Sequence, residues 1–249
     1  MAGAGSKGSG GRARRPRLLR RTAAGLAAAL ALFAAWQALT WPDVGALVST
    51  NPRDTAFIEA HRRAQRAAGR SDDVAFRFVP YPRIADDLKR AVLVGEDIGF
   101  FDHRGFEIAE MKKALAEARE ELELPRGAST ITQQLAKNLW LSPSRNPWRK
   151  AKEAALTWQL ERTLSKRRIL ELYLNVAEFG PGVYGAEAAA RRYFGKGASG
   201  LTAHEAAQLA AGLPKPSTWH PGSASRAYAR RVATIERRME RARHLAKLI

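Results

Sequence analysis

Apolar residues along this chain recur mostly with helical spacing, and they begin with one long stretch that carries no charge. Residues 22–42 contain no acid or base and are about long enough for one bilayer-crossing helix. Trp36 and Trp41 lie near the far end of this stretch, where amphipathic rings favour the lipid headgroups. The pattern predicts a transmembrane anchor. A cleaved signal peptide is the alternative, but the run is long and Trp41-Pro42 is a poor cleavage site.

The rest of the chain predicts a mostly α protein. Residues 43–73 have the pattern of a stem with a basic amphipathic helix at 55–66, which fits either a membrane-surface helix or a solvated one. Residues 74–79 alternate with a period of two and form the only convincing strand. Helical spacing then dominates residues 74–249, which we interpret as one domain. Helices are expected at 85–94, 106–121, 129–141, 149–164, 165–179, 185–194 and 202–213, with a basic helix at the end.

The charge of the chain limits the classes of partner that it is expected to bind. The net charge is +18, the pI is about 11.0, and there is no cysteine, which excludes thiol catalysis and disulfides. Residues 1–21 hold about seven of the positive charges and no acid, which predicts a cytoplasmic tail and an exported body. The remaining charge still calls for an anionic partner. Export and the lack of any nucleic-acid-binding signature argue against nucleic acid as this partner. A membrane-bound pyrophosphate fits both the predicted export and the remaining positive charge.

One stretch, residues 95–105, gathers groups suited to acid–base chemistry. It places the carboxylates of Glu96, Asp97 and Asp102 and the imidazole of His103 around a pair of phenylalanines. Carboxylates beside apolar bulk often have a raised pKa, which suits a general base or acid. Charge clusters are more often solvated surface, so this stretch alone does not define a site.

A second set of polar residues follows in two neighbouring helices. Thr130 and Gln133 have the spacing of a capping box, and Gln134, Lys137 and Asn138 share one helix face. Amides with a single lysine suit a groove that binds sugar hydroxyls and phosphate. Further on, four cations surround Glu153. They would keep its carboxylate ionised, or Glu153 would orient them around a leaving phosphate. These cations are Arg145, Arg149, Lys150 and Lys152.

These motifs resemble those of glycosyltransferase family 51, whose members polymerise peptidoglycan from lipid II. The resemblance is strongest to its monofunctional, membrane-anchored members. The first motif is matched by Glu96, Asp97, Phe100, His103 and Gly105, the second by residues 127–138, and the third by Arg149, Lys150 and Glu153. The match covers residues 74–240 in the family's order. Ala128, Gly95 and Glu107 depart from the usual pattern, but no charged residue with an assigned catalytic role is lost.

The resemblance implies a lysozyme-like, two-lobed helical domain and a role for each group. Glu96 would be the general base for the sugar 4-hydroxyl of the acceptor, and Glu153 would assist at the donor. Lys137, Arg145 and Lys152 would neutralise the pyrophosphate, with Arg149 and Lys150 beside them. Ser129, Thr130, Gln134 and Asn138 would bind substrate or shape the groove, and Asp97, Phe100 and His103 would support Glu96.

The same resemblance sets expectations for cofactors and partners. The donor is already activated, so no dedicated cofactor is expected; Mg²⁺ or Mn²⁺ could stimulate, although no His/Asp/Glu spacing predicts a metal site. The partners would be lipid II, the growing glycan chain, a membrane crossed once and, by analogy, cell-wall synthesis or division proteins. The catalytic domain would be periplasmic, on the inner membrane. The alternative is a membrane-anchored lysozyme-like hydrolase or lytic transglycosylase, which needs no pyrophosphate-sized set of cations.

Overall fold

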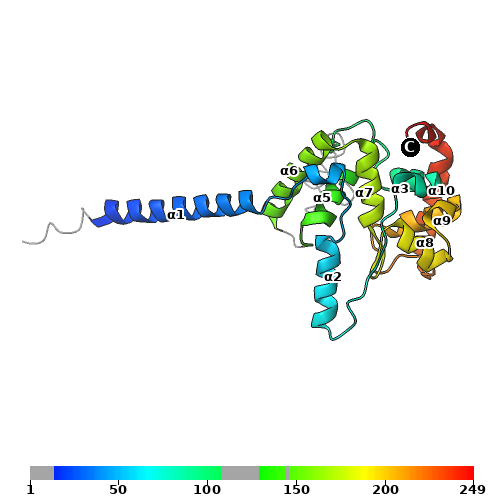
Figure 1. Ribbon diagram of the computed structural model, residues 1–249, viewed down its shortest axis with the longest axis horizontal. Coiled ribbons are helices and arrows are strands. Elements are labelled where there is room, and N and C mark those ends of the chain that lie inside the picture. The colour runs from blue at the N-terminus through cyan, green and yellow to red at the C-terminus, as the bar shows by residue number, and fades with distance from the viewer. Residues whose placement is uncertain (1–13, 108–128, 144–145) are drawn as a thin grey trace, which may run out of the picture. The chain divides into compact units, whose positions relative to one another are not determined.

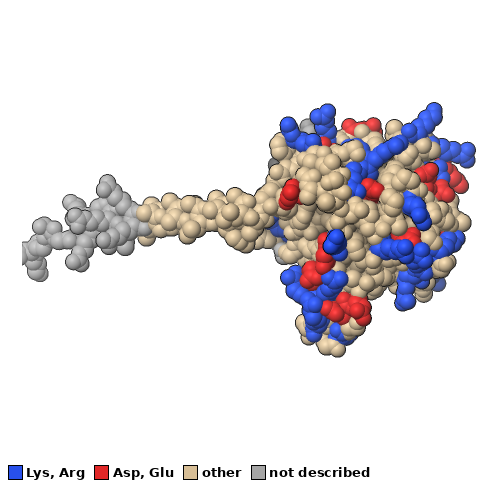
Figure 2. All heavy atoms as spheres, viewed as in Figure 1, with Lys and Arg blue, Asp and Glu red and all other residues tan. Residues whose placement is uncertain are grey.

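The structure, a computed structural model, describes residues 14–107, 129–143 and 146–249, and the chain divides into two compact units. The first unit, Met1–Asp43, contains helix α1 (Arg14–Leu39). Within α1, Thr22–Leu39 is long and apolar enough to cross a membrane, and none of this segment is buried in the protein. Figure 2 shows no charged side chain on it. The uncharged stretch therefore forms a helix whose length and composition suit a membrane anchor.

The second unit, Val44–Ile249, is mostly helical, which confirms the predicted fold class (Figure 1). Its helices are α2 (Ala56–Ala67), α3 (Asp86–Glu96), α5 (Ile131–Trp140), α6 (Pro147–Thr163), α7 (Lys166–Val176), α8 (Ala186–Phe194), α9 (Ala203–Gly212) and α10 (Arg226–Arg241). Short 3-10 turns lie at Gly45–Val48, Tyr81–Arg83, Ala198–Gly200 and Arg243–Lys247. Lys and Arg side chains are spread over the visible face of this unit, with Asp and Glu among them (Figure 2).

Capping residues set where several helices begin. The predicted capping box is confirmed: the Thr130 hydroxyl accepts from the Gln133 amide, and the Gln133 side chain accepts from the Thr130 amide at 3.0 Å. The Ser165 hydroxyl likewise caps α7. Helix α6 begins two residues before the expected start because Asn146 caps it and Pro147 occupies its first turn.

The described helices pack in two groups. Helix α5 packs against α2, α6 and α7, whereas α3 packs against α9 and α10. Leu88 and Leu93 of α3 and Leu135 of α5 are fully buried, and each such side chain contributes up to about 2 kcal/mol by leaving water. Glu96 is the last residue of α3, and it hydrogen-bonds to residues of both α5 and α10. The packing therefore places the Glu96 carboxylate where the two groups of helices meet.

A small sheet accompanies the helices. Its strand order is β1 (Ala75–Phe76), β3 (Val183–Tyr184) and β2 (Glu178–Gly180), with β1 parallel and β2 antiparallel to β3. Only two residues of the strand expected at 74–79 pair in the sheet, and β2 and β3 were not predicted because strands this short show no alternation. Gly185 follows β3 at φ +84°, and a Cβ there would lie 2.4 Å from the Asn175 carbonyl oxygen. Only glycine fits at this position.

The compact unit begins at Val44, well before the domain start at residue 74 expected from the sequence. Arg168 of α7 explains part of this difference, because its guanidinium donates to the carbonyl oxygens of Leu47 at 2.8 Å and Thr50 at 2.7 Å. Ile58 of α2 is also fully buried. The expected stem thus packs on the helices of the second unit. Of the helix expected at 106–121, residues 106 and 107 are not helical, and the rest lies outside the described residues.

Candidate active site

Glu96 is the centre of the site. Its side chain is 11% exposed, and its Oε1 accepts from the Arg231 guanidinium at 2.9 Å while its Oε2 accepts from the Gln134 amide at 3.1 Å. Burial raises the pKa of Glu96 above its usual value, and the donors from Gln134 and Arg231 oppose part of that rise. A carboxylate with a raised pKa is a stronger base for a substrate hydroxyl than an ordinary carboxylate.

A buried tyrosine fixes the orientation of Gln134. The Tyr173 hydroxyl donates to the Gln134 Oε1 atom at 2.8 Å, so the amide nitrogen must point toward Glu96. Tyr173 is 1% exposed, and burial raises the pKa of its hydroxyl well above the usual value, which keeps it protonated as a donor. The sequence analysis placed Gln134 in the site and assigned no role to Tyr173.

Arg231 was missed by the sequence analysis. It lies on α10, where we expected only a basic closing helix, and it reaches Glu96 across a sequence separation of more than a hundred residues. Arginines are frequent on this helix, so composition could not single out the one that faces inward. The stripe of buried apolar residues on α10, which includes Val232 and Ile235, was the available signal, because it shows which face of the helix turns toward α3.

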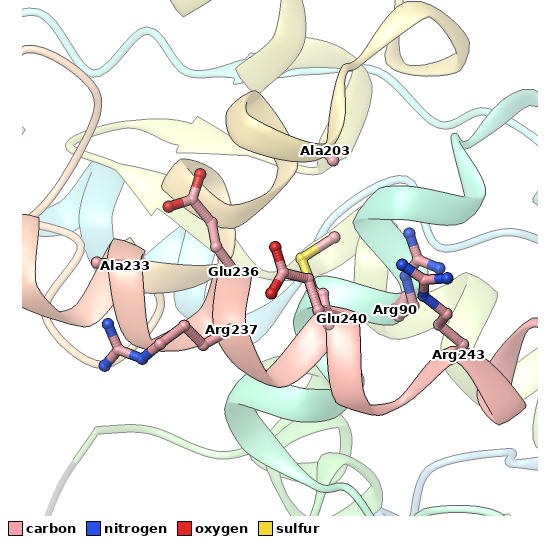
Figure 3. A pocket seen from close by; sticks show the side chains of 8 residues that line it. Arg90, Ala203, Ala233, Glu236, Arg237, Glu240 and Arg243 are labelled. Carbon is pink, nitrogen blue, oxygen red and sulfur yellow. The ribbon is translucent and has the colours of Figure 1, made fainter.

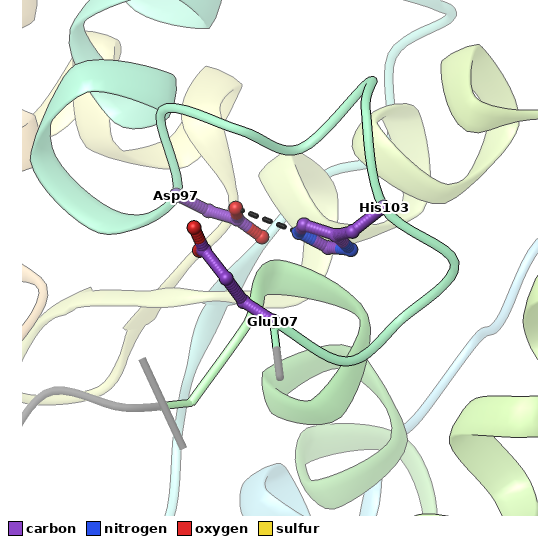
Figure 4. A group of neighbouring side chains, drawn as sticks. All are labelled: Asp97, His103 and Glu107. Atoms are coloured by element: carbon purple, nitrogen blue, oxygen red, sulfur yellow. Dashed lines mark hydrogen bonds and ion pairs between the residues drawn. The ribbon is translucent and has the colours of Figure 1, made fainter. Parts of the chain in front are cut away.

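Asp97 links the loop after α3 to the start of α5. Its Oδ1 atom lies 2.9 Å from His103 Nε2, and its Oδ2 atom accepts from the Ile131 backbone amide at 2.9 Å (Figure 4). The Thr130 hydroxyl closes the link by donating to the Gly105 carbonyl oxygen at 2.7 Å. Asp97 and His103 therefore hold the loop in place beside Glu96.

The cluster of Asp97, His103 and Glu107 offers three potential metal ligands, which the sequence spacing did not indicate (Figure 4). Their ligand atoms lie within 4.8 Å of one another. His103 Nδ1 accepts from the Gly105 amide at 3.0 Å, so its Nε2 carries the proton that it donates to Asp97. Both imidazole nitrogens are thus engaged, and a metal would have to displace the bond to Asp97. The donor set fits a hydrogen-bonded support better than a metal centre.

Replacing Asp97 with Ala is expected to lower the free energy of unfolding by about 3 kcal/mol, because the buried Ile131 amide and the partly buried His103 imidazole lose their acceptor. For a domain of this size, the melting temperature should fall by roughly 6–12 °C. Thermal unfolding of the full chain in detergent measures this. The exposed Asp102→Ala variant is the control and should melt like the wild type. Equal melting temperatures for both variants would remove the proposed link.

Lys137 and Glu153 form the second half of the site. Glu153 is 2% exposed, and it pairs with Arg149 at 2.9 Å and also with Lys150. Lys137, on α5, is largely buried, and burial lowers the pKa of its ammonium while the charges of Glu153 and Glu96 oppose that shift. Lys137 therefore lies within electrostatic range of both carboxylates. The expected crowding of cations around Glu153 is present for Arg149 and Lys150.

The remaining predicted residues take different positions. Ser129 is exposed at the start of α5, whereas Thr130 and Asn138 are buried on the same segment. The internal bonds of Thr130 favour a role in shaping the groove. Phe100 is fully buried and packs edge-on against Phe101 at 5.2 Å, under the loop. Lys152 is half-buried on α6, and Arg145 lies outside the described residues.

Two cavities lie on the α10 side of the unit. One, of about 500 Å³, has both acids and bases in its lining (Figure 3): Arg90, Glu236, Arg237, Glu240 and Arg243. It includes none of the predicted site residues. The other, of about 380 Å³, is lined by Val94 and Ile98, which flank Glu96 in the sequence, and by arginines of α10. The cations of α10 thus reach the surroundings of the site.

A buried carboxylate near a lysine, with a second carboxylate bound by cations, is an arrangement suited to acid–base catalysis. The family model described as Transglycosylase matches residues 62–240. A biosynthetic peptidoglycan transglycosylase from Thiobacillus denitrificans is 46% identical over 215 residues, which cover 86% of this chain and 93% of the relative. Proteins of the same name from Methylobacillus flagellatus and Laribacter hongkongensis are 43% and 42% identical, over 94% of each relative. The chain belongs to the transglycosylase family, which confirms the resemblance found in its motifs.

Proposed function

We propose that this protein polymerises lipid II into β-1,4-linked glycan strands and releases undecaprenyl pyrophosphate. The observation that carries the proposal is the buried Glu96, whose pKa is raised, interacting with Lys137 and so with the cation-bound Glu153. Such a site supplies a base for one hydroxyl and positive charge for one leaving group, and an activated donor needs nothing more. The names of the similar proteins support the same substrate class.

In the proposed step, Glu96 takes the proton of the acceptor's sugar 4-hydroxyl. The freed oxygen attacks the anomeric carbon of the growing chain, and the bond from that carbon to the pyrophosphate oxygen breaks with its electron pair. Attack from the opposite face inverts the α linkage to β. Lys137, Arg145 and Lys152 stabilise the charge that develops on the pyrophosphate, and Glu153 holds Arg149 and Lys150 beside it.

The other predicted residues would bind or position. Gln134 and Ser129 have polar groups near Glu96 and would contact the sugars, with Asn138 on the same helix. Thr130, Asp97, Phe100 and His103 would keep the loop and the groove in shape. No dedicated cofactor is proposed. Mg²⁺ or Mn²⁺ would act by neutralising pyrophosphate rather than through a resident site.

The proposed location is the inner membrane, which the chain crosses once. The basic tail before α1 would stay in the cytoplasm and the second unit would lie in the periplasm, in line with the distribution of Lys and Arg. Lipid II and the glycan chain would be its substrates, and cell-wall synthesis or division proteins its partners. Nucleic acid is not proposed as a partner.

Purified full-length protein in detergent, incubated with labelled lipid II, tests the function. The proposal expects consumption of lipid II, release of undecaprenyl pyrophosphate, and no loss of length from finished glycan strands added to the same reaction. A lysozyme-like hydrolase or lytic enzyme would do the reverse. It would shorten the finished strands and leave lipid II unchanged.

The raised pKa of Glu96 predicts the pH dependence of the rate. A general base works only when ionised, so kcat should fall as the pH drops through the pKa of Glu96, and this fall should lie above the usual carboxyl value of 4.5. Burial also raises the pKa of Glu178 on β2 to about 7, so Glu178→Gln is the control. The fall of kcat at low pH, its acid limb, should occur at the same pH in that variant as in the wild type. A limb that vanished with Glu178 would exclude Glu96 as its source.

A further inference from the structure

Two arginines of α10 hold the end of α3. The last carbonyl oxygens of a helix have no partner within it and need donors from elsewhere. Arg231 donates to the Gly95 carbonyl oxygen at 3.1 Å, and Arg238 donates to the Val94 carbonyl oxygen at 3.2 Å. Both carbonyls immediately precede Glu96. Helix α10 thus fixes the turn of backbone that carries the proposed base.

Arg231 also holds the carboxylate itself. The same nitrogen, Nη2, that binds the Gly95 carbonyl lies 2.9 Å from Glu96 Oε1. One guanidinium group therefore ties the carboxylate to its own backbone, which restricts the rotation of the Glu96 side chain. The side chain of Arg231 is 30% exposed, against 11% for Glu96. Within this pair, the arginine is therefore the more solvent-accessible partner and the carboxylate the more buried one.

The two oxygens of Glu96 are consequently not equivalent. Oε1 faces a permanent positive charge, whereas Oε2 faces the neutral amide of Gln134 at 3.1 Å. A proton placed on Oε1 would weaken a charge-assisted bond, and a proton on Oε2 costs only a bond to a neutral donor. We propose that Arg231 is a positioning residue that orients Glu96 and leaves Oε2 as the oxygen that accepts the substrate proton. This inference rests on the proposed role of Glu96 as the base.

The effect of removing Arg231 on the pKa of Glu96 depends on the other groups that face Glu96. Gln134 and Lys137 approach from α5, Tyr173 of α7 acts through Gln134, Asp97 is the next residue in the chain, and Arg231 comes from α10. Without Arg231, the rise in the Glu96 pKa caused by burial is opposed by Gln134 and Lys137. The acid limb of kcat should therefore move to higher pH, and the freed carboxylate should be oriented less well.

The test compares Arg231→Gln and Arg231→Lys with Arg230→Ala, an exposed arginine one position earlier on the same helix. Full-length proteins are assayed with lipid II across a range of pH. Arg231→Gln should lower kcat about 100-fold with KM near the wild-type value and shift the acid limb upward. Arg231→Lys keeps the charge but not the position of the Nη2 donor, so the acid limb should stay in place while kcat falls about 10-fold. Arg230→Ala should match the wild type.

Each outcome bears on the inference. The inference would be overturned if Arg231→Gln had the same rate and the same acid limb as Arg230→Ala. A wild-type kcat in Arg231→Lys would also overturn it. The Arg231→Lys result decides the question if Arg231→Gln does not fold. A change in KM alone would assign Arg231 to substrate binding instead and would equally overturn it. Failure of the proposed function has a different result, because the wild type and Arg230→Ala would then form no polymer.

Discussion

Glu96→Gln is expected to lower the rate of lipid II polymerisation by about 1,000-fold, since general base catalysis commonly contributes two to four orders of magnitude. The amide has the shape of the carboxylate but cannot take the acceptor's proton. Lipid II should still bind, because the proposed pyrophosphate cations are untouched. The measurement is the initial rate of polymer formation, with lipid II binding followed separately.

The matched control is Asp102→Asn, the same carboxylate-to-amide change at an exposed position in the loop that follows α3. It should polymerise at the wild-type rate. The Glu96→Gln protein should melt within a few degrees of the wild type, because the replacement is isosteric. Turnover like that of Asp102→Asn would refute the assignment of Glu96 as the base.

Lys137→Ala is the second large expected effect, a loss of about 100-fold in kcat/KM. The substitution removes a buried positive charge from the proposed pyrophosphate site, so both substrate binding and stabilisation of the leaving group should suffer. Lys137 also lowers the pKa of Glu96 through its charge, so the acid limb of kcat should move to higher pH in the variant. Steady-state kinetics over a range of pH measure both effects.

Lys137→Arg separates charge from packing, because it keeps the positive charge and should recover part of the lost activity. Arg63→Ala on α2 removes an exposed charge and should leave the kinetics unchanged. If Lys137→Ala raised neither KM nor the pH of the acid limb, the lysine would lie outside the pyrophosphate site.

The helices and their caps could be predicted because their signals are local. Thr130 with Gln133 and the serine at 165 are read within one turn of sequence, and the structure has caps at both positions. The pairing of Glu153 with Arg149 and Lys150 is also local, since these residues lie three and four positions apart on one helix. The family motifs then drew attention to Glu96.

The contacts that define the state of Glu96 could not be predicted in this way. Arg231 and Tyr173 meet the site through tertiary packing, and the local sequence does not show that either of them contacts Glu96 or Gln134. The link from Asp97 to the Ile131 amide likewise depends on how the loop folds back on α5. The short strands β2 and β3 exist because they pair with each other, not because their few residues favour a strand.

The product of lipid II turnover tests the central claim most directly. Labelled lipid II is incubated with the purified full chain, and the product is sized and then digested with a muramidase that cleaves only β-1,4 bonds. The account predicts long strands that appear with the wild type, are absent with Glu96→Gln, and are fully cut by the muramidase. Strands that resist the muramidase, or equal yields from both proteins, would contradict an inverting polymerase with Glu96 as its base.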